Sequence, residues 1–239
     1  MDLRSLLRKL IFANQRERDE WVRTQAAAVP PSARVLDVGA GSSPYRDLFS
    51  HCEYRTHDFA QLRPDQLVGR AGYAKLDYVA DITAIPVPDA SFDVILCTEV
   101  LEHVPEPIRA VREFARIVKP GGKLLLSAPL GSGLHQEPYH FYGGYTPHWY
   151  RKFLAEAGFR EITVQPNGGF FEHYSQESQR FLTCLSAAAG GKRFLAFALY
   201  LPLAPWFFLI CPLLCRALSS VDRDKSFTVG YHVTAKRSC

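Results

Sequence analysis

The run Glu99-Val100-Leu101-Glu102-His103 brings two carboxylates and an imidazole together within one short stretch. On a helix, Glu99 and Glu102 are spaced i, i+3 and Glu99 and His103 are spaced i, i+4, so the three side chains would share one face. Two carboxylates and an imidazole can bind a divalent ion, and a bound Mg²⁺ lowers the pKa of a hydroxyl ligand. The alternative is that His103 packs as an ordinary structural residue.

A second reactive stretch, residues 134–150 (LHQEPYHFYGGYTPHWY), is dense in histidine and aromatic residues. Such a segment can line an acceptor pocket in which aromatic walls exclude water and a histidine takes up a proton. We therefore take His103, His135 and His140 as the catalytic candidates. Each of them could instead be a hydrogen-bonded structural histidine.

A glycine turn, Gly39-Ala40-Gly41, follows the apolar run Arg34–Val38. Glycine lets the backbone approach a ligand closely, and the N-terminus of a following helix favours polar or anionic groups. A dinucleotide site needs the spacing GxGxxG, but Pro44 stands where the third glycine belongs. This departure counts against an NAD-dependent oxidoreductase, which remains an alternative.

The elements that must position these residues alternate along the chain. Short apolar or β-branched runs predict strands, and helical patterns with suitable caps lie between them. We expect a doubly wound, mostly parallel α/β sheet of seven strands, with an antiparallel last strand and an apolar helical insertion before it. The expected strands are residues 34–38, 53–57, 78–82, 91–97, 123–127, 160–165 and 227–235, and the expected helices include 107–118 and 146–157.

The run VLDVGAGSSPY at residues 35–45 resembles the first motif of the class I S-adenosylmethionine-dependent methyltransferases, in their small-molecule, type 11-like branch. The resemblance covers roughly residues 33–165 and implies a Rossmann-like methyltransferase fold. In that family the first motif holds the amino-acid end of the cofactor, an acid after the second strand binds the ribose hydroxyls, and a third acid contacts the adenine. The resemblance therefore implies a cofactor site formed by Asp37, Gly39, Ala40, Gly41, Asp58, Asp81, Ile82 and Thr98.

The ExxEH run resembles a metal site in ubiquinone-pathway O-methyltransferases and in small-RNA 3′-end methyltransferases. This resemblance implies Glu99, Glu102, His103 and His140, or His135 in place of His140, as ligands of Mg²⁺. The histidine segment also resembles the HxxPxHxxxxT region of methyltransferases linked to bacterial cell-surface sugars and lipids.

The composition sets outer bounds. The chain has 239 residues, of which 47% are apolar and 22% charged, so wholesale disorder is excluded. A net charge of +4 is too small to indicate a nucleic-acid partner. Six cysteines without a CxxC pair indicate reduced thiols and a cytoplasmic protein.

Residues 194–215 carry no charge and exceed the roughly 18 apolar residues that suggest a membrane span. Three prolines argue against one straight helix, and a single crossing would separate the last strand from the rest of the sheet. Lys192, Arg193 and Arg216 flank the segment, and residues 3–11 form a basic amphipathic pattern. We expect a broken helical hairpin at the membrane interface; the alternative is a lid packed on the domain.

These inferences predict a helical segment at residues 1–29 and a methyltransferase domain at residues 30–239, within which residues 172–222 form the insertion. The predicted reaction moves a methyl group from S-adenosylmethionine to a small-molecule, lipid-linked or sugar-linked acceptor, with oxygen favoured over nitrogen or carbon. We expect a cytoplasmic protein that contacts the inner face of the membrane. The nearly balanced charge disfavours a nucleic-acid partner, and the metal-like run leaves RNA as an alternative acceptor. A non-catalytic scaffold that binds the cofactor is the second alternative, and the oligomeric state is left open.

Overall fold

The computed structural model describes residues 13–67, 72–187 and 193–239. The chain divides into two compact units, one made of residues 20–165 and 230–239, the other of residues 166–229 together with the described part of the first 19 residues. The amphipathic pattern expected at residues 3–11 lies outside the described residues. The two units are taken separately below.

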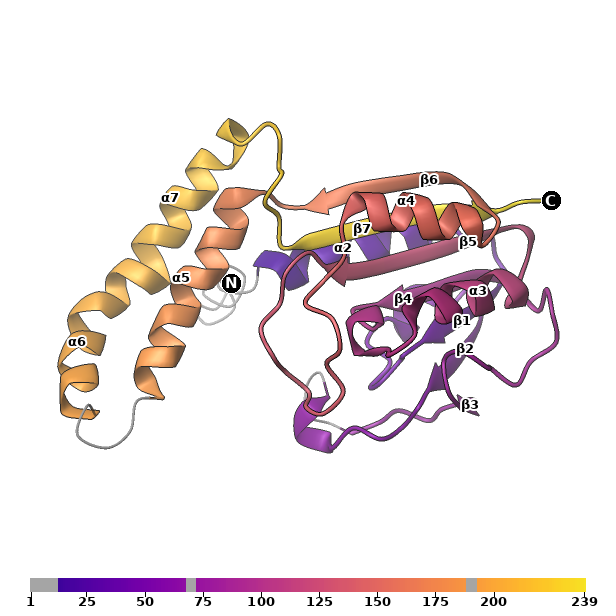
Figure 1. The fold of residues 1–239 in the computed structure, drawn as a ribbon, viewed down its shortest axis with the longest axis horizontal. Helices are drawn as coiled ribbons and strands as arrows, with labels where there is room; N and C mark the ends of the chain where they lie inside the picture. Colours follow the sequence, from indigo (N-terminus) through magenta and orange to yellow (C-terminus); the bar gives the residue numbers. More distant parts are fainter. Residues whose placement is uncertain (1–12, 68–71, 188–192) are drawn as a thin grey trace. The chain divides into compact units, whose positions relative to one another are not determined.

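The larger unit is built on a sheet of seven strands in the order β3-β2-β1-β4-β5-β7-β6 (Figure 1). Strands β1 to β5 pair in parallel, and β7 runs antiparallel to β5. This arrangement confirms the predicted α/β fold. The strands are β1 (Arg34–Val38), β2 (Glu53–Asp58), β3 (Tyr78–Val79), β4 (Phe92–Thr98), β5 (Val118–Pro129), β6 (Phe159–Asn167) and β7 (Gly230–Arg237).

Helices cover both faces of this sheet because alternate residues of its central strands point to opposite sides. Leu36 of β1 packs in one core cluster with Phe114 and Tyr150, whereas its neighbour Val35 packs in a second cluster with Trp21. The helices and single turns are α2 (Ala13–Ala27), η1 (Arg46–Phe49), η2 (Pro64–Gln66), η4 (Leu101–His103), α3 (Pro107–Ile117) and α4 (Pro147–Glu156).

Several boundaries differ from the sequence-based expectation. The third strand stops at Val79, because the Asp81 carboxylate folds back onto Thr83 and closes a turn. The fifth strand is longer than expected, since β5 starts at Val118 and includes the glycines that were expected to separate it from the helix. The helix expected at residues 146–157 is present as α4, and Thr146 caps it, since its Oγ1 accepts a hydrogen bond from the Trp149 N–H at 3.3 Å.

The smaller unit contains two long helices that lie side by side (Figure 1). The second of them runs without a break from Arg193 to Val221, and an 18-residue window within it has a mean hydropathy of 2.1, so by length and composition it can cross a membrane. The expectation that its prolines would break it is wrong. A π-helical turn at Trp206–Ile210 follows Pro205, and the helix continues through it. The elements are α5 (Phe170–Ser186), α6 (Arg193–Pro205), η6 (Trp206–Ile210), α7 (Cys211–Leu218) and η7 (Ser219–Val221).

Candidate active site

The glycine turn after β1 is held against the carboxyl end of the sheet. The N–H groups of Gly39 and Ala40 both donate to the His57 carbonyl, at 2.9 and 3.0 Å. Gly39 has a φ of 72°, and a Cβ at this position would lie 2.4 Å from Val100 Cγ2. Only glycine fits here, so the turn forms a close backbone cradle of the kind the sequence predicts.

Asp58 ends β2 directly beside this cradle. Its Oδ2 accepts from the Gly41 N–H at 2.9 Å, its Oδ1 accepts from the Ala60 N–H at 3.0 Å, and the residue is 4% exposed. A carboxylate offers about four acceptor positions, so roughly two remain after these bonds. These two remaining acceptor positions match in number the two vicinal hydroxyls of a ribose.

Asp37, near the end of β1, is buried and hydrogen-bonded by the Tyr54 hydroxyl, which donates to Oδ2. Burial raises the pKa of the Asp37 carboxyl to about 7, although the Tyr54 bond opposes that shift. Sequence reasoning missed Tyr54, whose place on the neighbouring strand follows from the β1–β2 register. Asp37 therefore contacts a structural partner in addition to the cofactor role predicted for it.

The raised pKa of Asp37 predicts a specific pH dependence of stability. As pH rises from about 4 to 7, the unfolded chain releases this proton near the usual 3.8 while the folded chain retains it up to about 7. Stability therefore falls across that window, by on the order of 4 kcal/mol for this group. We expect Asp37→Asn to remove the fall. Urea unfolding of both proteins at pH 4.5 and pH 8 checks this, and a mutant-minus-wild-type difference that does not grow with pH contradicts it.

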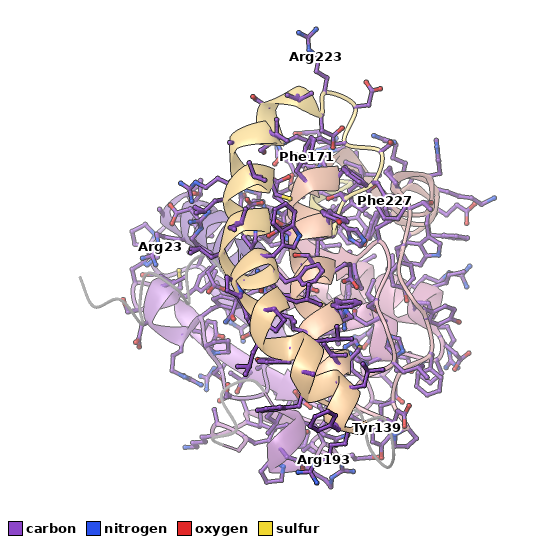
Figure 2. All side chains as sticks on the ribbon, turned by 90° about the vertical axis from the view of Figure 1, so that its left-hand side faces the viewer. Arg23, Tyr139, Phe171, Arg193, Arg223 and Phe227 are labelled. Atoms are coloured by element: carbon purple, nitrogen blue, oxygen red, sulfur yellow. The ribbon has the colours of Figure 1, made fainter. Side chains whose placement is uncertain are left out.

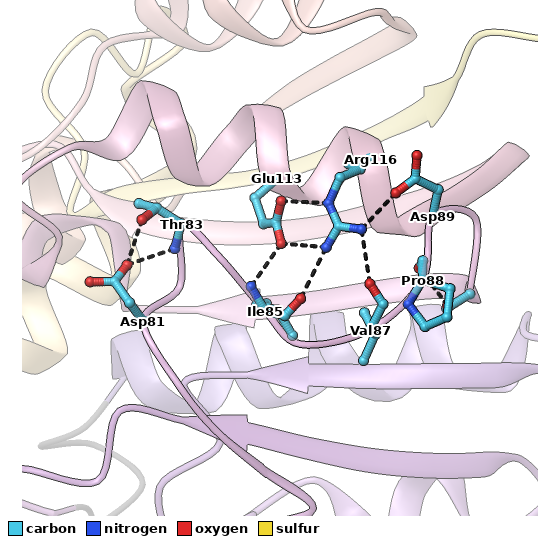
Figure 3. Close-up of polar contacts among 9 residues, drawn as sticks. Asp81, Thr83, Ile85, Val87, Pro88, Asp89, Glu113 and Arg116 are labelled. Atoms are coloured by element: carbon cyan, nitrogen blue, oxygen red, sulfur yellow. Dashed lines mark hydrogen bonds and ion pairs between the residues drawn. The ribbon is translucent and has the colours of Figure 1, made fainter.

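The third acid lies in the loop after β3. Asp81 Oδ1 accepts from the Thr83 N–H and hydroxyl, at 2.8 and 2.7 Å, and Figure 3 shows the second oxygen pointing away from this turn. That oxygen is available to an exocyclic amine such as that of adenine. Ile82 is buried beside it, and Thr98 ends β4 opposite Ser127 of β5.

A polar clamp on α3 fixes the segment that follows Asp81 (Figure 3). The buried Glu113 accepts from the Ile85 N–H at 2.7 Å and also binds Arg116. Arg116 in turn donates to the carbonyls of Ile85 and Val87 and to Asp89, at 2.7 to 3.0 Å. Sequence reasoning missed this pair, whose only sequence signal is an i, i+3 acid–base spacing on a predicted helix.

The expected helix across Glu99–His103 is wrong. Glu99 adopts a left-handed backbone with a φ of 54°, and a single 3₁₀ turn then begins at Leu101. As a result Glu99 leaves the predicted shared face, and its Oε1 accepts from the Ser127 hydroxyl at 2.7 Å. Glu102 and His103 stay together, with 3.8 Å between Glu102 Oε1 and His103 Nε2.

The three predicted histidines lie together. The ring centroid of His135 lies 4.8 Å from that of His103 and 4.6 Å from that of His140. The Nδ1 of His103 is 2.5 Å from the Tyr139 carbonyl, and the Nδ1 of His135 is 2.9 Å from the Gly133 carbonyl. A carbonyl can only accept, so each Nδ1 carries the proton and each Nε2 keeps its lone pair.

Burial is the main cause that lowers the pKa of His103, to about 4, and the neighbouring imidazoles add to it. The pKa of His140 is lowered as well, again mainly by burial. His135 is the exposed member of the three. His103 and His140 are therefore neutral imidazoles at neutral pH.

A folded-back loop between β5 and α4 produces this cluster. The N–H groups of Phe141 and Tyr142 donate to the Glu102 carbonyl, at 2.9 and 3.1 Å, and the loop extends to η2 (Figure 1). There Gln136 Nε2 donates to the Gln66 carbonyl at 2.8 Å. The loop thus joins the 3₁₀ turn to the segment that follows Asp58.

Glu102, His103 and His135 could also hold a metal ion, since their ligand atoms all lie within 4.8 Å of one another. This set differs from the predicted one, because Glu99 bonds to Ser127 instead. His135 takes the place first assigned to His140, whose Nε2 lies 3.0 Å from the Ser132 hydroxyl.

Known proteins match the sequence over its central part. Residues 36–126 match the family described as "Methyltransferase domain". The chain is 36% identical over 114 residues to a demethylmenaquinone methyltransferase of Renibacterium salmoninarum, covering 45% of this chain and 46% of that protein. It is 38% identical over 103 residues to a ubiquinone biosynthesis O-methyltransferase of Xanthomonas oryzae pv. oryzae, covering 40% and 42%. The chain spans about half the length of the curated relatives it matches.

Solved structures share the fold at low identity. The [4+2]-cyclase SpnF matches with a TM-score of 0.54 at 18% identity, covering 93% of this chain and 80% of that one. Phosphoethanolamine N-methyltransferase 2 of Haemonchus contortus, solved with S-adenosyl-L-methionine, matches with a TM-score of 0.51 at 17% identity, covering 90% and 52%. These two likenesses bear on the fold alone. Residues 36–126 are thus similar to a methyltransferase domain, and the two solved structures share the fold.

Proposed function

We propose that this chain transfers a methyl group from S-adenosylmethionine to an oxygen of a small, amphiphilic acceptor. The observation that carries the proposal is that the glycine cradle and the histidine cluster share one structural link. Val100 packs on Gly39, and the His103 N–H donates to the Val100 carbonyl at 2.9 Å. The turn that this hydrogen bond closes therefore supports both the proposed cofactor cradle and the proposed proton acceptor.

The cofactor supplies an electrophilic methyl group, and the chain supplies positioning and a base. Asp58 binds the ribose hydroxyls, Asp81 accepts from the adenine amine, and the glycine turn admits the amino-acid end. The acceptor hydroxyl then loses its proton to Nε2 of a cluster histidine as its oxygen is aligned with the methyl group. His135 is the best placed of the three, because its Nδ1 is the atom bonded to the Gly133 carbonyl, which leaves the Nε2 lone pair for a proton, and because the residue is exposed.

The acceptor class is inferred from the relatives and from the smaller unit. The names of the two curated relatives, a demethylmenaquinone methyltransferase and a ubiquinone biosynthesis O-methyltransferase, favour a ring hydroxyl on an apolar tail as the first acceptor to test. The apolar helix Arg193–Val221 suits a peripheral protein at the inner face of the membrane, where such molecules reside. Lipid-linked sugars are the second class to test.

Calorimetric titration with S-adenosylmethionine, with NAD as the comparison, tests the cofactor. We expect micromolar binding of the former and none of the latter, followed by transfer of labelled methyl to hydroquinones with isoprenoid tails. Binding of NAD alone would overturn the proposal. Cofactor binding without transfer to any membrane extract would favour a non-catalytic scaffold.

We extend the proposal to a divalent metal at Glu102, His103 and His135. Two imidazoles and one carboxylate suit Zn²⁺ or Fe²⁺ better than Mg²⁺, which prefers oxygen ligands. A metal there would polarise the acceptor hydroxyl and lower its pKa.

Metal content gives a prediction that is independent of activity. We expect the purified protein to retain one equivalent of a divalent transition metal by mass spectrometry, and His135→Gln to lose it. His148→Gln, which changes an exposed histidine on α4, serves as the control and should retain the metal. Full methyl transfer in the presence of a strong chelator, with no metal in the protein, would remove the metal from the proposal and leave the histidines as bases.

A further inference from the structure

The apolar helix Arg193–Val221 is packed on one side only. Its buried side faces α5, where the rings of Phe207 and Phe181 lie 4.8 Å apart. The opposite side carries apolar residues at steps of four, and they are 43 to 63% exposed. These are Phe197, Leu201, Leu209 and Leu213, with Pro205 completing the stripe.

The partner helix α5 differs from the apolar helix in carrying charged side chains along its length. Its buried side is formed by Ser175, Ser178, Gln179 and Leu182. Its outer side carries the Glu177–Arg180 ion pair at 2.8 Å, with side chains 37 and 51% exposed. α5 also exposes the rings of Phe170, Tyr174 and Phe181, at 45 to 48%, so its outer surface is mixed, whereas the apolar helix carries no charge from residue 194 to 215.

Charges on the apolar helix are confined to its ends. Figure 2 looks onto this helix, with Arg193 at one end and Arg223 beyond the other. No charged residue occurs from Phe194 to Cys215. Trp206, which is 45% exposed, lies in the middle, and tryptophan and basic side chains favour the boundary between water and lipid.

Connectivity argues against a crossing. The chain leaves β6 before α5 and enters β7 after the apolar helix, and both strands belong to one sheet. If the apolar helix crossed a bilayer, α5 would have to cross back. That would place Glu172, Glu177 and Arg180 at membrane depth, where charged side chains are costly.

We propose that the apolar helix lies parallel to the surface, in the interfacial region of one lipid leaflet, with α5 on its aqueous side. This inference rests on the membrane association included in the proposed function and specifies its mode. The exposed stripe enters the acyl region, and the arginines at the ends lie at the level of the headgroups.

Flotation of the full chain with vesicles of phosphatidylcholine and phosphatidylglycerol tests the lipid-facing side. The wild type should float, and the double variant Leu201→Glu/Leu209→Glu should partition at least roughly tenfold less, because the buried leucines supply the attraction. The matched control Thr183→Glu/Ser186→Glu changes exposed residues of α5 and should float like the wild type. A wild type that stays in solution, or equal losses for both pairs, overturns the proposal. Unchanged affinity for S-adenosylmethionine in every variant shows that the domain is folded and keeps the cofactor proposal separate.

Thiol labelling distinguishes a flat helix from a crossing hairpin. Cys184, near the end of α5, is exposed, and a Cys52→Ser/Cys239→Ser background removes the other accessible thiols. A membrane-impermeant maleimide added outside sealed vesicles should modify Cys184 as fast as in solution. Protection that is relieved only by detergent would mean that the hairpin crosses, and would overturn the flat arrangement.

Discussion

Replacing Asp58 with alanine should weaken the binding of S-adenosylmethionine by roughly thirtyfold to a thousandfold. The substitution removes two charge-assisted hydrogen bonds to the ribose, about 2 to 4 kcal/mol in total. It also leaves the N–H groups of Gly41 and Ala60 without their carboxylate partner, so the cradle itself loosens. Calorimetric titration of the cofactor at neutral pH measures the loss.

Two further variants make this expectation specific. Asp58→Asn retains one carbonyl acceptor, which can still bind Gly41 or Ala60, and should fall between wild type and Asp58→Ala. Asp47→Ala removes an exposed carboxylate on η1 and should leave the affinity unchanged. Wild-type affinity in Asp58→Ala would sink the ribose assignment, whatever else the protein binds.

The clustering of the residues proposed for the cofactor could be predicted from the sequence because they follow strand ends. In a parallel sheet, the residues after β1 and β2 meet at one edge, so the spacing of Gly39, Gly41 and Asp58 already defines the cradle. Strand β4 pairs in parallel with the other side of β1, so Thr98 at the end of β4 lies at that same edge. Local periodicity and strand order suffice for this part of the molecule.

The acceptor side could not be predicted in the same way, because it depends on a non-local fold-back. His135 and His140 reach His103 only because the loop bonds to the Glu102 carbonyl, and no helical or strand period specifies that contact. Glu99 was misplaced for a related reason. Its spacing fits a helix, but β4 continues through Thr98 and the backbone turns left-handed directly after it.

The fold also leaves the reaction open. SpnF, a [4+2]-cyclase, matches this chain about as well as a methyltransferase solved with its cofactor does. The fold is therefore compatible with more than one reaction, and the side chains around the site decide the chemistry. The proposed reaction assigns that part to the histidines, and their removal gives the sharpest test of it.

We expect His135→Ala to lower kcat for methyl transfer by about 10² to 10⁴, the usual contribution of a general base. The affinity for S-adenosylmethionine should stay the same, because His135 contacts neither the glycine turn nor Asp58 in the proposed arrangement. His103→Gln should cost less in proton transfer, since a pKa of about 4 makes His103 a weak base, but it should disturb the loop through the bond to Tyr139. His148→Ala is the matched exposed control.

Chemical rescue decides how His135 acts. Because the residue is exposed, free imidazole can reach the vacated position in His135→Ala and should restore part of kcat if a base is missing. If the missing function is a metal ligand, added Zn²⁺ or Fe²⁺ should restore the rate and imidazole alone should not. A His135→Ala enzyme with wild-type kcat and wild-type metal content would exclude both roles and move the search for the base to His140, whose Nε2 lies beside the Ser132 hydroxyl.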